Sequence, residues 1–183
     1  MAVARPAFGS VVVCVAAALA ALATALSLAT APARAGSSSQ LSVLDSGVFQ
    51  QINFIRTQHG LVALRLSSEL GEAADEHSEQ MAEDGYFEHE SADGTLFWKR
   101  IATYYPSGSY SYWSVGENLL WASPTVGPAS ALQMWMHSPE HRANILNPRW
   151  REIGISAVHA GHAPGVYGDR TITVITTDFG VRH

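Results

Sequence analysis

The chain has little cysteine, and this shortage excludes several classes of site. Its 183 residues contain one cysteine, Cys14, which lies inside an apolar run near the N-terminus. With no second cysteine an intramolecular disulfide is excluded, and the chain beyond this run has neither a cysteine nucleophile nor a thiolate metal site. A domain of about 150 residues can bury enough apolar surface to fold without disulfides.

Positive charge is also scarce. Lys99 is the one lysine, and the sequence has 16 acidic residues against 11 basic ones. Arg5 and Arg34 lie in the N-terminal leader described below, so nine basic residues remain and the net charge becomes −7 with neutral histidine. No basic cluster is visible along the sequence, so the positive surface of a nucleic-acid-binding protein is not indicated. We therefore expect no nucleic-acid partner.

The N-terminus has the pattern of a secretory signal peptide. Arg5 precedes an almost unbroken apolar run over residues 11–28, and Ala33-Arg34-Ala35 before Gly36 is a typical cleavage site. Residues 1–35 are therefore predicted to be a signal peptide, and the mature protein is predicted to be secreted, without stable membrane insertion. The alternative is an uncleaved anchor, because an apolar run of about 18 residues is long enough to cross a bilayer.

The remaining residues have the size of one domain, over residues 44–183, preceded by a flexible Ser-rich linker at 36–43. Apolar residues at helical spacing predict helices over residues 44–59, 68–84 and about 124–137. Alternating β-branched and small residues predict strands over residues 113–120, 152–159 and 171–179. This order is not a βαβ repeat. It fits an α+β fold in which helices flank a mostly antiparallel central sheet.

Four short blocks carry the candidate chemistry. They are Phe87-Glu88-His89, Gly116-Glu117-Asn118, Ser138-Pro139-Glu140-His141-Arg142-Ala143-Asn144-Ile145-Leu146 and Thr177-Asp178-Phe179-Gly180. His89, Glu117 and His141 lie 28 and 24 residues apart, too far for one helix face, so a tertiary fold must bring them together. Each also has an ordinary explanation: a histidine after a helix is usually a surface residue, and a glutamate between glycine and asparagine is typical of a solvated turn.

The third block overlaps a sequence that imitates a zinc-peptidase signature. Residues 137–141 match H-x-x-E-H, in which both histidines must lie on one helix face. Pro139 prevents this, because it has no N–H to donate and its ring clashes with the preceding turn. We expect Ser138 to be the N-cap and Pro139 the first residue of a new short helix, with His137 pointing elsewhere.

In order and spacing, the four blocks resemble the CAP superfamily, which comprises cysteine-rich secretory proteins, antigen 5 and plant pathogenesis-related proteins. The bacterial, cysteine-poor branch fits best, and the resemblance covers about residues 44–180. It implies a three-layer α-β-α sandwich. It also implies that His89, Glu117 and His141 belong to a cleft tetrad of two histidines and two glutamates.

The sequence departs from this tetrad at one position. The second glutamate of the family usually follows shortly after a tryptophan, whereas here the residue three after Trp135 is Ser138. Glu140 is close in sequence but adjacent to His141, so the fourth position stays open.

The resemblance implies a secreted binding module whose ligand is a sterol or other lipid, cell-wall material or a protein. His89, Glu117 and His141 would suit zinc or another divalent cation, and equally an ordinary hydrogen-bonded cluster without metal. A second hypothesis is a hydrolase with Glu117 as the general base. A third is a structural or interaction protein with no active cleft. Because no nucleophile motif is evident, we favour the binding module over an enzyme.

Two further features have structural explanations. Aromatic residues are dense in one segment, at Phe97, Trp98, Tyr104, Tyr105, Tyr110, Tyr112, Trp113 and Trp121. They either pack a long loop onto the sheet, which we favour, or form a groove wall that stacks a sugar or lipid. His77 shares the inner face of its predicted helix with Met81, so we expect a core or rim histidine with satisfied hydrogen bonds.

Overall fold

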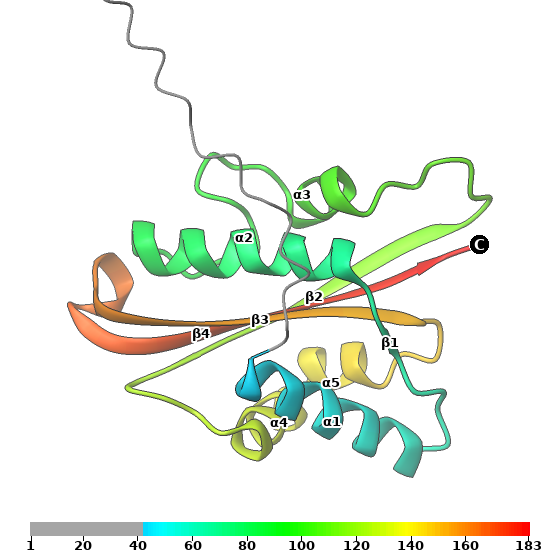
Figure 1. The fold of residues 1–183 in the computed structure, drawn as a ribbon, viewed down its shortest axis with the longest axis horizontal. Coiled ribbons are helices and arrows are strands. Elements are labelled where there is room, and N and C mark those ends of the chain that lie inside the picture. The colour runs from blue at the N-terminus through cyan, green and yellow to red at the C-terminus, as the bar shows by residue number, and fades with distance from the viewer. Residues whose placement is uncertain (1–41) are drawn as a thin grey trace, which may run out of the picture. The chain divides into compact units, whose positions relative to one another are not determined.

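The computed structural model describes residues 42–183, which form a sheet between two layers of helices (Figure 1). The four strands of this sheet, in the spatial order β1-β3-β4-β2, are β1 (Arg65–Leu66), β2 (Trp113–Ala122), β3 (Glu152–Ala163) and β4 (Arg170–Arg182). β2 and β3 both pair antiparallel with β4, whereas the short β1 pairs parallel with β3. The prediction of an α+β fold with a mostly antiparallel sheet is confirmed.

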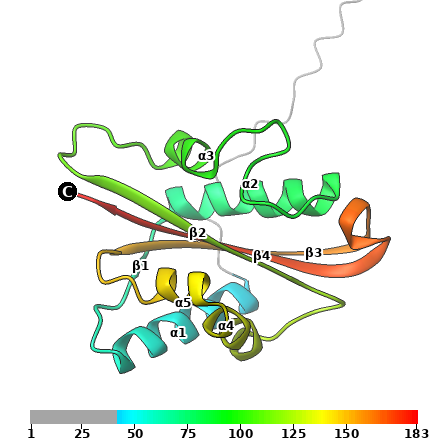
Figure 2. The same cartoon turned by 180° about the vertical axis from the view of Figure 1, so that it is seen from behind.

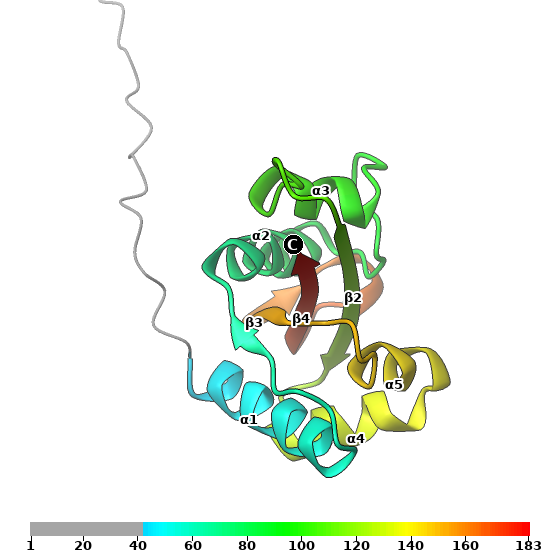
Figure 3. The same ribbon diagram turned by 90° about the vertical axis from the view of Figure 1, so that its right-hand side faces the viewer.

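Helices cover both faces of the sheet. One layer contains α2 (Ser68–Asp84) and α3 (Phe97–Tyr104), and the other contains α1 (Val43–Gln58), α4 (Pro128–His137) and α5 (Pro139–Ile145) (Figures 1 and 2). Figure 3 looks toward the end of the sheet and shows the three layers one above another. The α-β-α sandwich implied by the sequence resemblance is therefore the observed architecture.

The helix ends follow local sequence signals. Ser42 caps α1 in a capping box, where its hydroxyl accepts from the backbone N–H of Asp45 and the Asp45 carboxylate accepts from the backbone N–H of Ser42. Ser67 caps α2 through the N–H of Leu70, and Gly85 ends this helix with a positive φ of 75°. The observed helices agree with the predicted ranges, residues 44–59 and 68–84, to within one residue at each end.

Each helical layer is held by its own apolar contacts. The largest core cluster joins α1, α4 and α5 to the sheet through residues such as Ile52, Trp135 and Phe179. On the other face, α2 lies directly on β3 because Gly154 has no side chain. A Cβ at Gly154 would come within 2.1 Å of the Leu70 carbonyl carbon.

Several predicted elements differ from the observed ones. The helix expected from about residue 124 begins at Pro128, which takes the favourable first-turn position, whereas Pro124 lies in the preceding loop. α3 falls inside the segment expected to be a loop, and the two-residue β1 was not predicted. β2, β3 and β4 extend beyond their predicted ends.

The predicted signal peptide, residues 1–35, lies outside the described residues, as does most of the predicted linker at 36–43. The last two residues of that linker, Ser42 and Val43, begin α1. Within residues 42–183, no helix combines the length and apolar character needed to span a membrane.

Candidate functional site

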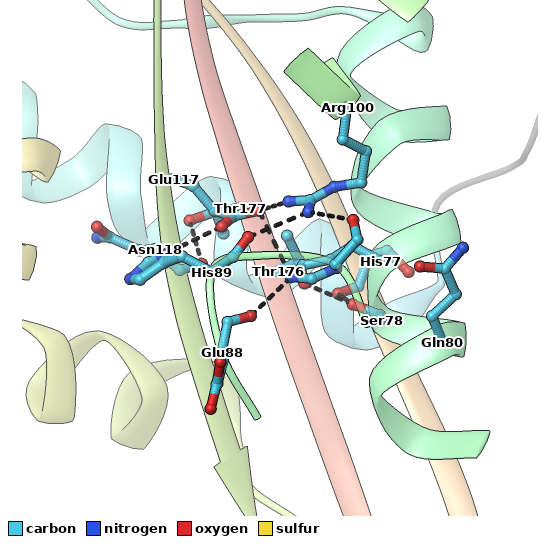
Figure 4. Close-up of polar contacts among 12 residues, drawn as sticks. His77, Ser78, Gln80, Glu88, His89, Arg100, Glu117, Asn118, Thr176 and Thr177 are labelled. Carbon is cyan, nitrogen blue, oxygen red and sulfur yellow. Dashed lines mark hydrogen bonds and ion pairs between the residues drawn. The ribbon is translucent and has the colours of Figure 1, made fainter. Parts of the chain in front are cut away.

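Glu117 is the centre of a buried polar cluster on the α2 and α3 side of the sheet. It lies on β2, and its side chain is fully buried. Its Oε1 lies 2.7 Å from Nδ1 of His89, and its Oε2 accepts a hydrogen bond from the guanidinium of Arg100 (Figure 4). Because a carboxylate only accepts hydrogen bonds, this contact places a proton on Nδ1 of His89. The structure therefore directs Nε2 of His89 away from Glu117, on a side chain that is 49% exposed.

Arg100 ties the segment that carries His89 to the sheet. It lies on α3 with a buried side chain, and its Nη1 donates to the carbonyl oxygen of His89 and to Oγ of Ser91, each at 3.1 Å. The same guanidinium neutralises Glu117. Arg100 was not predicted as a site residue because α3 was expected to be a loop, and a basic residue among aromatic ones gave no sign of an ion pair.

The second and third sequence blocks meet where α5 packs beside β2. Nδ2 of Asn118 donates to the carbonyl oxygen of His141, and Nδ2 of Asn144 donates to the carbonyl oxygen of Glu117, both at 3.1 Å. Gly116 permits this approach, since a Cβ there would lie 2.7 Å from Oδ1 of Asn144. The glycine and both asparagines thus attach the start of α5 to the strand that carries Glu117.

His141 is half-buried near His89. Burial is the main cause that lowers the pKa of His141, and the nearby His89 lowers it further, whereas Glu140 raises it. His141 is therefore held toward its neutral form. Its backbone carbonyl accepts from Asn118, the neighbour of Glu117 on β2, and its ring interacts electrostatically with His89.

His137 does not join this group. It is exposed at the end of α4, and its Nδ1 lies 2.7 Å from the carbonyl oxygen of Gln133. Ser138 occupies the N-cap position of α5 with an extended backbone, although its hydroxyl makes no capping hydrogen bond, and Pro139 is the first helical residue. The predicted break within H-x-x-E-H is confirmed, and the peptidase arrangement is excluded.

His77 lies behind Glu117 and is fully buried on α2. Its Nε2 is 3.0 Å from the carbonyl oxygen of Glu88 and 4.0 Å from Oε2 of Glu117. Burial lowers the pKa of His77 to about 4, so the ring is neutral at physiological pH and donates from Nε2 to the Glu88 carbonyl. The prediction of a core histidine with satisfied hydrogen bonds is confirmed.

Asp178 is the second buried carboxyl group of the cluster. It stands directly opposite Glu117 in the β2–β4 ladder, so both side chains lie on the same face of the sheet. It is fully buried, and neither carboxyl oxygen makes a hydrogen bond of normal geometry with the described residues. Burial, followed by the negative charge of Glu117, raises the pKa of Asp178 well above its ordinary range. Asp178 is therefore held toward its protonated form, beside the Glu117 carboxylate that Arg100 compensates.

The residues present do not fit a metal ion. Both oxygens of Glu117 are engaged by His89 and Arg100, and the guanidinium brings a positive charge next to any cation held there. Within residues 42–183, no three His, Cys, Asp or Glu side chains are arranged to hold a metal. The zinc site suggested for His89, Glu117 and His141 stays a prediction without a fitting set of ligands.

The dense aromatic segment divides between core and surface. Tyr105 is fully buried, and its carbonyl oxygen accepts a hydrogen bond from the indole Nε1 of Trp113 at 2.9 Å. Trp121 packs edge-on against Tyr167. Trp98 and Tyr110 are exposed. Packing onto the sheet, the preferred interpretation, therefore accounts for the inner members of this segment.

Comparisons with known proteins agree with this architecture. A family model described as "Cysteine-rich secretory protein family", abbreviated CAP, matches residues 49–175. The Bacillus subtilis protein YkwD is 32% identical over 124 residues, which cover 67% of this chain and 46% of YkwD. The chain thus spans less than half the length of this curated relative.

Two solved structures share the fold. An extracellular protein from Bacillus anthracis that contains an SCP domain is 27% identical with a TM-score of 0.54, over 74% of this chain and 40% of that one. An outer surface protein from Borrelia burgdorferi is 21% identical with a TM-score of 0.58, over 74% of this chain and 90% of its own.

Proposed function

Because the chain belongs to the cysteine-rich secretory protein family, CAP, we propose that it is a secreted ligand-binding module. Its ligand contacts the surface formed by His89 and His141. The observation that carries this proposal is the His89 ring, which Glu117 holds through Nδ1 while Nε2 faces outward on a half-exposed side chain. An imidazole fixed in this way offers a ligand a hydrogen-bond acceptor of defined direction.

Binding fits this arrangement better than hydrolysis by Glu117. A general base must reach the proton that it removes, and its oxygen must be free to accept it. The carboxylate of Glu117 is buried, with one oxygen held by His89 and the other by Arg100. Glu117 therefore serves to orient His89 rather than to contact the ligand.

The charges near the two imidazoles disfavour an anionic ligand. Glu88 and Glu90 flank His89 on the exposed surface, and Glu140 acts electrostatically on His141. These carboxylates repel an anion, whereas hydroxyl and amide groups can donate to Nε2 of His89. The Phe97 ring, 6.2 Å from the His89 ring, adds an apolar face of the kind that packs against sugars. Among lipid, wall and protein ligands, we therefore favour a neutral cell-wall glycan.

The test is co-sedimentation of the purified exported protein with insoluble peptidoglycan. His89→Asn keeps a side-chain donor that can reach Glu117 but lacks Nε2, so we expect a folded protein that binds at least about tenfold more weakly. His141→Ala should weaken binding in the same direction. His137→Ala is the matched control, because His137 is an exposed histidine outside the group, and its binding should stay within about twofold of the parent.

Two results would contradict the proposal. The first is unchanged binding by the His89→Asn and His141→Ala variants when thermal melts show that both are folded. The second is an equal loss in the His137→Ala variant, which would indicate non-specific adsorption. A parent protein that does not sediment with peptidoglycan would exclude the wall glycan as ligand.

The contact between Glu117 and His89 also supports a second candidate function. A carboxylate behind an imidazole is the arrangement that makes histidine an effective general base toward a ligand hydroxyl or water. His89, rather than Glu117 as expected from the sequence, would then abstract the proton. Release of reducing sugar ends from peptidoglycan, lost in both His89→Asn and Glu117→Gln variants, would support hydrolysis, whereas binding without release supports the module alone.

A further inference from the structure

Four arginines gather around one surface cavity at the end of the sheet where the chain terminates. The cavity has a volume of about 740 Å³, and its lining includes Arg65, Arg149, Arg151 and Arg182. Arg65 comes from β1, Arg149 and Arg151 from the turn before β3, and Arg182 from the last residue of β4. Pairing of β1 with β3, and of β3 with β4, brings these distant positions together. We call this group the arginine cavity.

Positive charge dominates this cavity, in contrast to the acidic character of the chain. Glu152 is the one carboxylate side chain in its lining, against four guanidinium groups. Arg56 adds a further positive charge behind it. Arg56 is fully buried and donates to the carbonyl oxygens of Val62, Ile145 and Asn147. Burial lowers its pKa, and the positive charge of Arg151 lowers it further.

Three of the four guanidinium groups have nitrogens available to a ligand. The Arg65 side chain is 78% exposed and lies 3.5 Å from Oε1 of Glu152, a distance typical of a weak surface ion pair. Arg149 is exposed, and among residues 42–183 its guanidinium has no ion pair or hydrogen bond. Arg151 uses Nη1 to close its own turn through the carbonyl oxygens of Pro148, Arg149 and Trp150, so its other nitrogens remain free to donate.

Arg182 forms a fixed wall of the cavity. Its guanidinium lies 3.9 Å from the centre of the Tyr105 ring and 5.3 Å from that of Tyr110, and it is paired with Glu69. Tyr110 and Tyr112 also line the cavity, so aromatic surface stands beside the positive charge. A ligand with an anionic group and an adjoining organic part could contact both.

We propose that the arginine cavity binds the phosphate group of a phosphate ester. Guanidinium groups match the oxygens of phosphate or carboxylate through paired hydrogen bonds. A carboxylate has two oxygens to share among Arg65, Arg149 and Arg151, whereas a phosphate group has three or four. The remaining volume accommodates the organic part of the ester against Tyr110 and Tyr112. The cavity lining does not include His89, Glu117 or His141, so this site is independent of the glycan surface proposed above.

Calorimetric titration with pyrophosphate tests the proposal. The parent protein should bind pyrophosphate at least about tenfold more tightly than citrate, which has a similar charge at pH 7 but presents carboxylates. Arg65→Glu combined with Arg149→Glu should weaken pyrophosphate binding by about tenfold or more, because both side chains are exposed and their reversal leaves the core intact. Added salt should weaken binding of the parent, as expected for exposed charges.

The matched control reverses two exposed arginines outside the cavity, Arg142→Glu with Arg170→Glu, and its affinity should stay within about twofold of the parent. An equal loss in this control, equal affinity for citrate, or no binding of pyrophosphate would overturn the proposal. If the double variant at the cavity does not fold, Arg149→Glu alone should give a smaller loss in the same direction, and an unchanged affinity would refute the site.

Two further probes identify the source of the phosphate group. Binding of glycerol 3-phosphate in solution, dependent on Arg65 and Arg149, indicates a soluble phosphate ester. Co-sedimentation with phosphatidylglycerol vesicles but not with phosphatidylcholine vesicles, again dependent on both arginines, indicates a lipid headgroup. Both outcomes support the site, and sedimentation with vesicles that is unaffected by the Arg65→Glu and Arg149→Glu changes counts against it.

Discussion

The Asp178→Asn variant should become more stable than the parent protein, and the difference should grow as the pH rises. The substitution removes a carboxyl group that has to keep its proton in the folded state. Asp178 is fully buried beside Glu117, and burial raises its pKa well above the ordinary value. Between the ordinary aspartate pKa of about 3.9 and this raised value, the folded protein holds a proton that the unfolded chain has released. In that window the free energy of unfolding contributed by Asp178 falls by about 1.4 kcal/mol per pH unit.

His77 has the opposite effect in the same range. Burial lowers its pKa to about 4, so the unfolded chain takes up a proton below about pH 6.5 that the folded protein does not. Its contribution to stability is therefore present above pH 6.5 and is lost as the pH falls to about 4, by about 3 kcal/mol in total. In the parent protein the effects of His77 and Asp178 oppose each other, and the Asp178→Asn variant should reveal that of His77.

The measurement is urea unfolding between pH 4 and 6.5, followed by the fluorescence of the five tryptophans. Subtracting the parent from the variant cancels every group that both share. The Asp178→Asn variant should gain up to about 3 kcal/mol relative to the parent between pH 4 and pH 6.5, the limit set by 1.4 kcal/mol per pH unit. Asp84→Asn, which changes an exposed aspartate at the end of α2, is the matched control and should give a difference that changes little with pH.

A pH-independent difference between the Asp178→Asn variant and the parent would refute this explanation. It would mean that Asp178 titrates alike in the folded and unfolded states, so that burial beside Glu117 has no effect on its proton. A variant that loses stability relative to the parent as the pH rises would refute it equally. Because the two carboxyl groups share a site, the proton measured belongs to the pair of Asp178 and Glu117 rather than to one residue.

Three further results are expected. Arg100→Ala should lower the free energy of unfolding by about 3–5 kcal/mol, because it leaves a buried carboxylate uncompensated, and adding Glu117→Gln should restore much of this loss in urea melts. Gly154→Ala should cost about 3 kcal/mol or more or prevent folding, because its Cβ would meet the backbone of α2, whereas Gly127→Ala, with no atom within 4 Å, should change the melting temperature little. N-terminal sequencing of the exported protein should show cleavage after Ala35, and recovery of the intact N-terminus in membranes would indicate an anchor instead.

The sequence predicted the elements whose ends carry local signals. Ser67 and Gly85 delimit α2 because a hydroxyl cap and a left-handed glycine act within a few residues of the chain. α3 has no such signals: its N-cap, Leu96, makes no side-chain capping bond, and aromatic residues obscure its apolar face. The start of α4 was placed too early because two prolines, Pro124 and Pro128, each resemble a helix start.

The site was predictable only in part, because its contacts join separate elements. The sequence blocks singled out His89, Glu117 and His141, and the structure places His89 in contact with Glu117. Arg100 was missed because an ion pair between α3 and β2 leaves no periodicity in either segment. Asp178 lies within one of the four sequence blocks, but its importance depends on the β2–β4 register, which local sequence does not encode.

The place of β4 in the sheet determines when the protein can fold. β4 is the last element of the described chain, yet it lies between β3 and β2 and pairs with both. During synthesis from the N-terminus, neither ladder can form before its 13 residues are complete, and until then α1 and α2 have no finished sheet to cover. We therefore expect the sheet to form only after β4 has been synthesised. For the secreted protein proposed above, this order keeps the growing chain open for passage through an export channel.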